Sequence, residues 1–125
     1  MNWNDFKYFT EKEFTCKCGC GCSNVSPEFL IKLEEAREIA GTPFKINSGC
    51  RCKTHNKKIG GVEHSPHLCS KHLPSFAADI HCNTDRRRFL IVQALIDAGF
   101  THIGLSKKDR FIHVDDDSRK AVWLY

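Results

Sequence analysis

Apolar side chains recur at helical spacing in the first third of the chain. Between positions 29 and 40 the members of this repeat are Phe29, Leu33, Ala36 and Ala40. Intervals of three and four residues put side chains on one face of a helix. Ser26 and Pro27 supply a capping hydroxyl and a residue suited to the first helical position, and Gly41 can adopt the left-handed conformation that ends a helix. The pattern predicts a helix over residues 26–40.

A second helical repeat follows in the last third of the chain. Its apolar members are Phe89, Val92, Leu95 and Ile96. Thr84 can cap the start of this helix, and Gly99 can end it. The pattern predicts a helix over residues 84–99 with this apolar stripe against the core.

Five short segments have the composition of strands, and they cover residues 44–48, 76–81, 102–105, 111–115 and 121–124. With the two helices they predict an α+β fold, in which packed helices cover a small antiparallel sheet. A chain of 125 residues fits one domain over 1–125, with a cysteine-rich N-terminal arm over 1–25.

Strand parity brings polar groups of two segments to one face of this sheet. In the segment 111–115, Ile112 and Val114 would point into the core, so His113 and Asp115 would share the opposite face. The same parity in the segment 77–81 puts Asp79 on the face away from the core. His81 shares that face with Asp79, so two strands are each expected to present an imidazole and a carboxylate.

Composition and net charge limit the fold classes and the kinds of binding partner to be expected. With 41% hydrophobic and 27% charged residues, the chain is expected to pack a core rather than to be disordered or to form a coiled coil. The net charge of +4 comes from scattered basic residues, which argues against nucleic acid as a partner. No apolar run approaches the roughly 20 residues of a membrane helix, and the start MNWNDFKYFTEKEF has no features of a signal peptide. We expect a monomer with no membrane partner, and the cellular location stays open.

The polar face suits a metal. A catalytic zinc commonly has three protein ligands from His, Asp or Glu and keeps a fourth position open. Asp79 and His113 are two such ligands, and a third can come from the histidine-rich stretch that contains His64, His67 and His72.

Four motifs resemble those of a known zinc peptidase family, the D-alanyl-D-alanine carboxypeptidases and L-alanyl-D-glutamate endopeptidases, which share the hedgehog fold. The segment SKHLPSFAAD at 70–79 resembles the signature S-x-H-x-x-G-x-A-x-D, with Ser75 in place of the glycine. SGCR at 48–51 resembles S-G-Y-R, and HNKKIGG at 55–61 resembles H-N-x-x-x-G-G. FIHVD at 111–115, with the later Trp123, resembles the last zinc-binding strand and tail of phage and bacterial members.

The resemblance implies a Zn²⁺ peptidase that cleaves stem peptides of bacterial peptidoglycan, as a carboxypeptidase or an endopeptidase. Its metal ligands would be His72, Asp79 and His113, and Arg51 would steady the substrate carbonyl or carboxylate. SPHL at 65–68 is a second textual match to the start of the signature, but His67 precedes Asp79 by twelve positions, whereas His72 has the family spacing of seven. The spacing therefore favours His72. The alternative function is a non-catalytic zinc domain that binds wall peptides or a protein partner.

A general base is the missing part of the pattern. Relatives place an acid three residues before the last ligand, or a His two residues before it, and these positions hold Arg110 and Phe111. Asp115 is the first candidate because parity puts it beside His113, and Asp109 is the second, with His81 behind them.

Eight cysteines are unusual in so short a chain. Cys16, Cys18, Cys20 and Cys22 alternate in the N-terminal arm, while Cys50 and Cys52 flank Arg51. A structural zinc site, disulfides and free thiols are all open. Cys69 and Cys82, which flank the signature, could bridge the loop between them.

Overall fold

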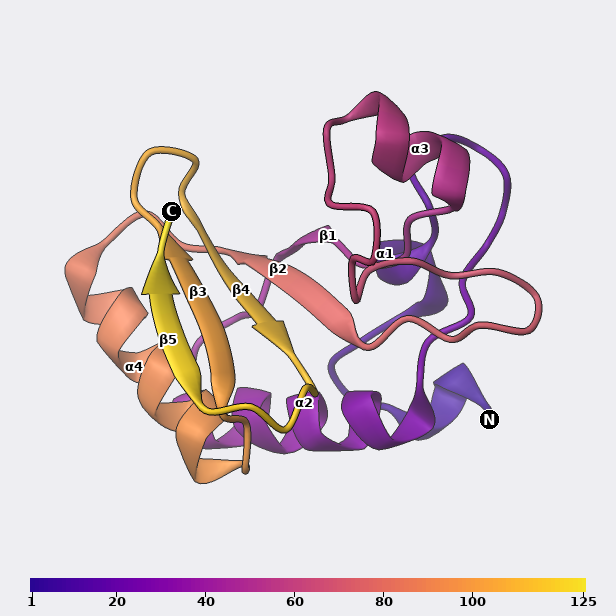
Figure 1. The fold of residues 1–125 in the computed structure, drawn as a ribbon. Helices are drawn as coiled ribbons and strands as arrows, with labels where there is room; N and C mark the ends of the chain where they lie inside the picture. Colours follow the sequence, from indigo (N-terminus) through magenta and orange to yellow (C-terminus); the bar gives the residue numbers. More distant parts are fainter.

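The computed structural model describes residues 1–125 and has a sheet with two helices packed on one of its faces (Figure 1). The helices are η1 (Trp3–Asp5, 3-10), α1 (Glu11–Phe14), α2 (Pro27–Ala40), α3 (Lys53–Lys58) and α4 (Asp85–Asp97). The strands are β1 (Ile46–Ser48), β2 (Ala77–His81), β3 (His102–Ser106), β4 (Phe111–Asp115) and β5 (Ala121–Leu124). The predicted α+β fold is confirmed.

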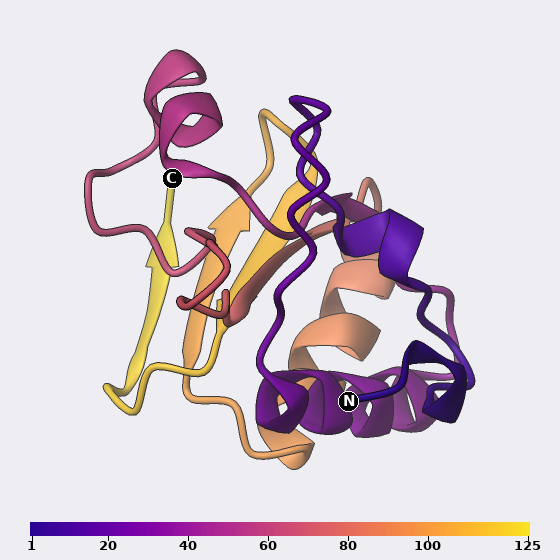
Figure 2. The same cartoon turned by 90° about the vertical axis from the view of Figure 1, so that its right-hand side faces the viewer.

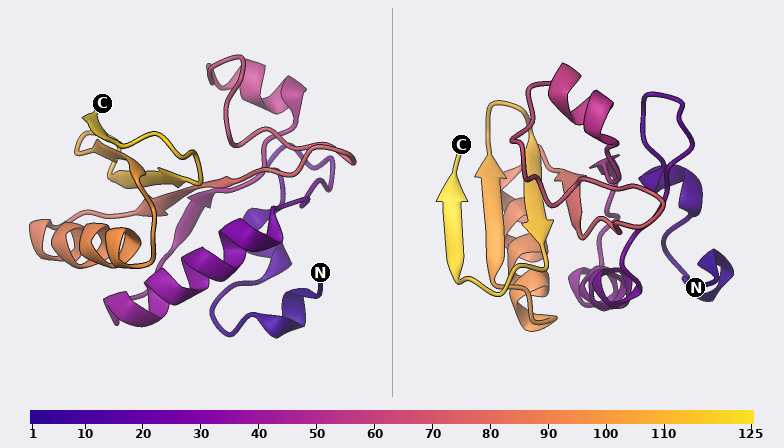
Figure 3. Two further views of the ribbon diagram at one scale, coloured as in Figure 1. Left: turned by 60° about the horizontal axis from the view of Figure 1, so that its bottom comes forward. Right: turned by 45° about the vertical axis from the view of Figure 1, so that its right-hand side comes forward.

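The five strands form one sheet in the order β1-β2-β4-β3-β5. All neighbours are antiparallel except β3 and β5, which run parallel at the edge. Helices α2 and α4 lie on one side of the sheet, and α3 with the loop after it lies on the other (Figure 3). A functional site on the opposite face of the sheet would therefore lie between the strands and the loop that follows α3.

Both predicted helices form with the expected caps. The Ser26 hydroxyl accepts a hydrogen bond from the Phe29 amide, and Gly41 has a φ of 64°. The Thr84 hydroxyl caps α4 by accepting from the Arg87 amide. Local sequence therefore determines where these helices begin and end.

The predicted buried stripe of α4 is only half right, since Leu95 is buried and Val92 packs against the core, but Phe89 and Ile96 do not. Phe89 and Ile96 are 65% and 52% exposed, whereas the buried residues of this helix are Ile91, Ala94 and Leu95. Both sets satisfy helical spacing, so periodicity alone could not choose between them. The choice is made by packing, because α4 packs against both α2 and β4 and turns Ile91, Ala94 and Leu95 toward them.

The core lies between the sheet and helices α2 and α4. Ala78 and Ile80 of β2 and Ile112 and Val114 of β4 all belong to its cluster of 22 buried residues. This confirms the predicted parity of both strands. The residues between them consequently face the other side of the sheet.

The N-terminal arm packs along the segment that precedes α3 (Figure 2). Phe14 lies against Gly49, where an added Cβ would come within 2.7 Å of the Phe14 ring. The Cys50 amide donates to the Phe14 carbonyl at 2.9 Å. The arm therefore supports the segment that carries Arg51.

Candidate metal centre

Three buried side chains converge on the face of the sheet opposite α2 and α4. His67 Nε2 lies 3.2 Å from Asp79 Oδ1, His113 Nδ1 lies 2.9 Å from the same oxygen, and the two nitrogens are 3.3 Å apart. The residues are 2%, 7% and 5% exposed, respectively. Three ligand-type atoms thus meet around one point.

Sheet register and one loop bring these residues together. Asp79 of β2 stands directly opposite His113 of β4 in the antiparallel ladder, where facing side chains are close neighbours. His67 comes from the loop after α3, which is fixed by a backbone hydrogen bond from the Arg51 amide to the His67 carbonyl at 2.8 Å. Two ligand atoms therefore come from rigid strands and the third from a tied loop.

The remaining polar atoms of the three residues are held by outer partners. His67 Nδ1 lies 2.7 Å from the Gly49 carbonyl oxygen, and His113 Nε2 lies 2.7 Å from Asp115 Oδ2. A carbonyl or carboxylate oxygen only accepts, so each of these nitrogens carries the hydrogen and the other ring nitrogen presents a lone pair in the neutral ring. Arg51 donates to the second Asp79 oxygen at 3.0 Å.

The electrostatics agree with a site for positive charge. Burial alone would raise the pKa of Asp79, but hydrogen bonds with His113 and His67 outweigh it and hold the pKa well below its usual range. Burial alone would lower the pKa of His113, yet its contacts with Asp115 and Asp79 raise it. The carboxylates therefore favour a cation between the rings.

These residues fit a metal ion. Two imidazole lone pairs and a carboxylate oxygen about 3 Å apart repel one another unless a proton or a metal lies between them. The donor set and the outer hydrogen bonds that fix each ligand are typical of a catalytic zinc centre.

The family model of peptidase M15 matches residues 7–115. The chain belongs to the peptidase M15 family. The resemblance found in the sequence motifs is thereby confirmed. M15 members are metal-dependent peptidases, so this chain is a metallopeptidase, and its three converging residues form a group that could hold a metal ion. No curated protein matches the chain.

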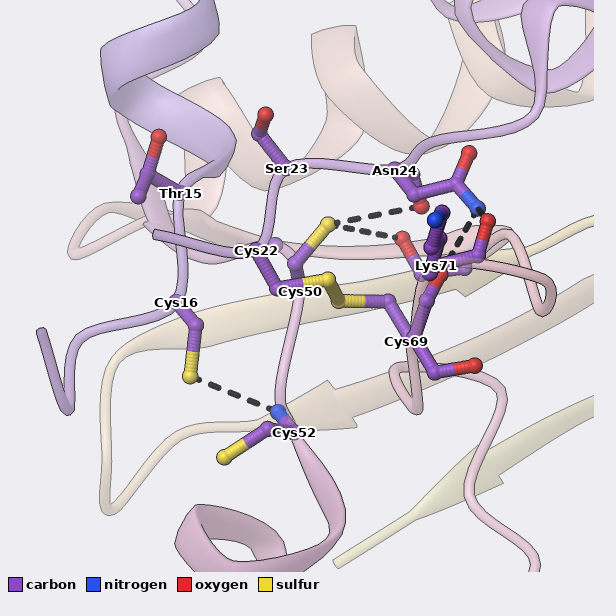
Figure 4. The surroundings of a disulfide bond; sticks show 12 residues. Thr15, Cys16, Cys22, Ser23, Asn24, Cys50, Cys52, Cys69 and Lys71 are labelled. Atoms are coloured by element: carbon purple, nitrogen blue, oxygen red, sulfur yellow. Dashed lines mark hydrogen bonds between the residues drawn. A yellow bond between two sulfur atoms is a disulfide. The ribbon is translucent and has the colours of Figure 1, made fainter. Parts of the chain in front are cut away.

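His72, the predicted ligand, is not part of the converging group. His72 is exposed, in a turn closed by hydrogen bonds between Ser70 and Leu73. This turn lies between His67 and Asp79, which are twelve positions apart, and the residue that converges with Asp79 and His113 is His67, where the spacing had favoured His72. A disulfide from Cys22 to Cys69 ties the start of the turn to the N-terminal arm (Figure 4), and it replaces the bridge suggested between Cys69 and Cys82.

Arg51 holds Asp79 in addition to facing the cleft. Its guanidinium also donates to the Ser48 hydroxyl at 3.0 Å and to Asn56 Oδ1 at 3.5 Å. Asn56 in turn contacts Gly61, where an added Cβ would lie 2.0 Å from the amide oxygen. The motifs S-G-C-R and H-N-x-x-x-G-G therefore form one hydrogen-bonded unit that steadies a metal ligand.

Asp115 is more enclosed than a free base would be. It is 2% exposed, and its oxygens contact His113 Nε2, His102 Nδ1 and the Asp117 amide at 2.7–2.9 Å. Hydrogen bonds with His113 and His102 outweigh the effect of burial and lower its pKa. The carboxylate is thus occupied in orienting two imidazoles.

His102 is a residue of the site that the sequence analysis missed. It lies on β3 opposite Asp115, and its ring packs on Trp123 of β5 at 4.6 Å between centroids. Trp123 can approach because Gly104, opposite His113, has no side chain: an added Cβ would lie 2.6 Å from the indole. A lone glycine within a strand pattern was the available signal for this close approach.

A cleft opens over the metal centre. Its lining includes Arg51, His64, Asp109, Phe111, Arg119 and Tyr125. The Asp109 carboxylate has no hydrogen-bond partner, whereas the other candidate base, His81, does not line the cleft.

No helix of this chain has both the length and the apolar character that crossing a bilayer would require.

Proposed function

We propose that the protein is a zinc-dependent peptidase that hydrolyses peptide bonds in the stem peptides of bacterial peptidoglycan. The observation that carries the proposal is the convergence of His67, Asp79 and His113, each with its other polar atom already occupied. We assign these three residues as the zinc ligands, with His67 in place of His72.

Zinc is the ion that this donor set favours, because two imidazoles and one carboxylate leave a tetrahedral ion one open position. Zinc bound there would act as a Lewis acid toward the scissile carbonyl. The proposed ligands are buried, while a cleft lined by Arg51, Phe111 and Trp123 among others opens above them. An open coordination position beside a cleft is what hydrolysis of a peptide requires.

The other polar residues of the site have separate roles in this proposal. Arg51 and Asp115 are positioning residues, because they hold Asp79 and His113. Asp109 is the proposed general base, since it lines the cleft with an unoccupied carboxylate. The first candidate, Asp115, is thus assigned to orientation instead of proton transfer.

The chemistry of the cleft supports a peptide with free carboxylates as substrate. Arg51 and Arg119 line it, and aromatic rings of Phe111, Trp123 and Tyr125 form part of its wall. Guanidinium groups suit the carboxylates of stem peptides, and the rings offer apolar surface to short side chains. The motifs shared with the wall-cleaving peptidases point to the same substrate.

The test compares His67→Ala with its matched control His72→Ala on purified peptidoglycan. We expect wild-type protein to release new amino groups, and a chelator to abolish the release. His67→Ala should reduce activity to background and lose the zinc of this centre, while His72→Ala should keep both. Loss of zinc in His72→Ala with retention in His67→Ala would refute the ligand assignment.

The second candidate is a non-catalytic zinc domain that binds wall peptides. Arg110 and Phe111 favour it, because they occupy positions where relatives carry the base. The same assay separates the two functions. Sedimentation with peptidoglycan, without release of amines by zinc-loaded protein, would establish the binding domain.

A further inference from the structure

A second group of metal-binding side chains lies outside the cleft. The sulfur atoms of four cysteines are all within 4.8 Å of one another, and these residues are Cys16, Cys18, Cys20 and Cys52. Three come from the loop after α1, and the fourth directly precedes α3. We propose that these four thiols bind a structural zinc ion, a site separate from the candidate catalytic centre and independent of the proposed activity.

Sulfur spacing distinguishes this group from disulfides. Cys18 Sγ lies 3.5 Å from Cys16 Sγ and 3.5 Å from Cys52 Sγ. A disulfide requires about 2.05 Å between sulfurs, whereas tetrahedral zinc with Zn–S bonds of about 2.3 Å puts its sulfurs about 3.8 Å apart. The separations are close to the edge of a Zn–S₄ tetrahedron. Zinc entry would convert the thiols to thiolates and release their protons to solvent.

The loop is shaped so that alternating cysteines face one point. Gly19 and Gly21 have φ values of 90° and 82°, conformations that residues with a Cβ rarely adopt. The Cys16 amide donates to the Cys22 carbonyl at 2.8 Å, which closes the loop at its base. In a regular strand, alternate residues share one face but lie in a line along the strand. The turns at the two glycines are therefore needed to bring the three sulfurs of the loop to one point.

Backbone donors already serve two of the sulfurs. The Cys52 amide donates to Cys16 Sγ at 3.3 Å (Figure 4), and the His55 amide donates to Cys52 Sγ at 3.4 Å. Hydrogen bonds of this kind stabilise thiolate ligands. Lys17 and Lys53 adjoin the proposed ligands in sequence and would supply positive charge in the same segments as a zinc with four thiolates, whose net charge is negative.

The site would tie the N-terminal arm to the segment that carries Arg51. Cys52 follows Arg51 directly, and Cys16 lies two residues after Phe14, whose carbonyl accepts from Cys50. No strand pairing joins the loop of 16–22 to Cys52, so the ion would add a covalent link to the hydrogen bond from the Cys52 amide to Cys16 Sγ. A closed four-thiolate centre suits this role, because it leaves no position for substrate.

The decisive measurement is the number of zinc ions per chain, by elemental analysis of native protein. We expect two in the wild type, one in Cys18→Ser/Cys20→Ser, and one in His67→Ala/His113→Ala. The matched control is Cys82→Ser, which removes a buried thiol outside the group and should keep two. One zinc in the wild type that survives Cys18→Ser/Cys20→Ser would overturn the proposal.

Two further readouts decide the case even where a variant fails to fold. Cobalt substitution of wild-type protein should give the intense near-ultraviolet absorption of thiolate-to-cobalt charge transfer, which His and Asp ligands cannot produce. Absence of that band would overturn the proposal. Intact mass under denaturing, non-reducing conditions should show the loss of two hydrogens only, for the Cys22–Cys69 bond; loss of four or more would assign the group to disulfides.

Discussion

The His67/Asp79/His113 centre and the four-cysteine group solve the placement of ligands in opposite ways. Two ligands of the first centre stand on paired strands, and every ligand has a second hydrogen bond that fixes its orientation. The cysteines of the second group lie in loops, and two of them are exposed. The first site is organised by the fold, whereas the second would be organised by its ion.

This difference teaches what each site can do. A preorganised centre with a free coordination position beside a cleft suits catalysis, because its ligands need not rearrange when substrate binds. A site whose ligands lie in loops can convert metal affinity into stability of the chain around it. Metal removal should therefore abolish the chemistry at one site and loosen the N-terminal arm at the other.

The largest expected effect in the cleft concerns the base. Of the two sites, only the catalytic one needs a group that accepts a proton, and Asp109 is the proposed base. Because a positioned base typically contributes such a factor, Asp109→Asn should lower kcat by roughly a hundredfold to ten-thousandfold. Zinc content at both sites should stay unchanged, because Asp109 touches no ligand. Turnover of peptidoglycan and zinc analysis on the same preparation check this. Full activity of Asp109→Asn together with inactivity of His64→Gln would move the role to His64, which also lines the cleft.

A smaller effect is expected from the residue that orients His113. Asp115→Asn should weaken zinc binding at the catalytic centre by about tenfold to a hundredfold, the usual cost of losing an outer hydrogen bond to a ligand. The cysteine group should keep its zinc with unaltered affinity. Competition with a chromogenic chelator measures both, and Asp97→Asn on α4 is the matched control. Unchanged affinity with lost turnover would instead make Asp115 the base.

The sequence predicted most of the fold because its signals were local. Capping residues located α2 and α4, strand-like composition located the five strands, and alternation gave the facing of Asp79 and His113. The parallel pairing of β5 with β3 was missed, since register between distant strands has no local signal. α3 was missed as well, because its six residues carry no apolar repeat.

The same contrast explains the errors at the site. Asp79 and His113 follow from strand parity, whereas the third ligand depends on how a loop is routed. Constant spacing favoured His72, but hydrogen bonds between Ser70 and Leu73 close a turn around it, and it is His67 that lies beside Asp79. His102 needs the register of β3 against β4, which no motif encodes.

The smallest effect tests whether the two sites are coupled through Arg51, which lies between a cysteine of the group and one outside it. Cys52→Ser removes a zinc ligand, whereas Cys50→Ser keeps a hydroxyl where the thiol contacts Ser75. The Arg51 guanidinium remains tied to Ser48 in both. Cys52→Ser should therefore lower kcat/KM by less than roughly tenfold, the lower end of the cost of losing an outer partner.

Cys50→Ser should leave both zinc ions and kcat/KM unchanged, because a hydroxyl can replace the buried thiol as donor at that position. If both variants lose activity equally, the effect comes from packing around Arg51 and not from the ion. If Cys52→Ser loses its zinc but no activity at all, the cysteine group stabilises the N-terminal arm alone. The coupling would be established by a drop in kcat/KM that occurs in Cys52→Ser alone and is restored, with the zinc, in Cys52→His. In that case the zinc of the cysteine group helps to position Arg51 beside the His67/Asp79/His113 centre.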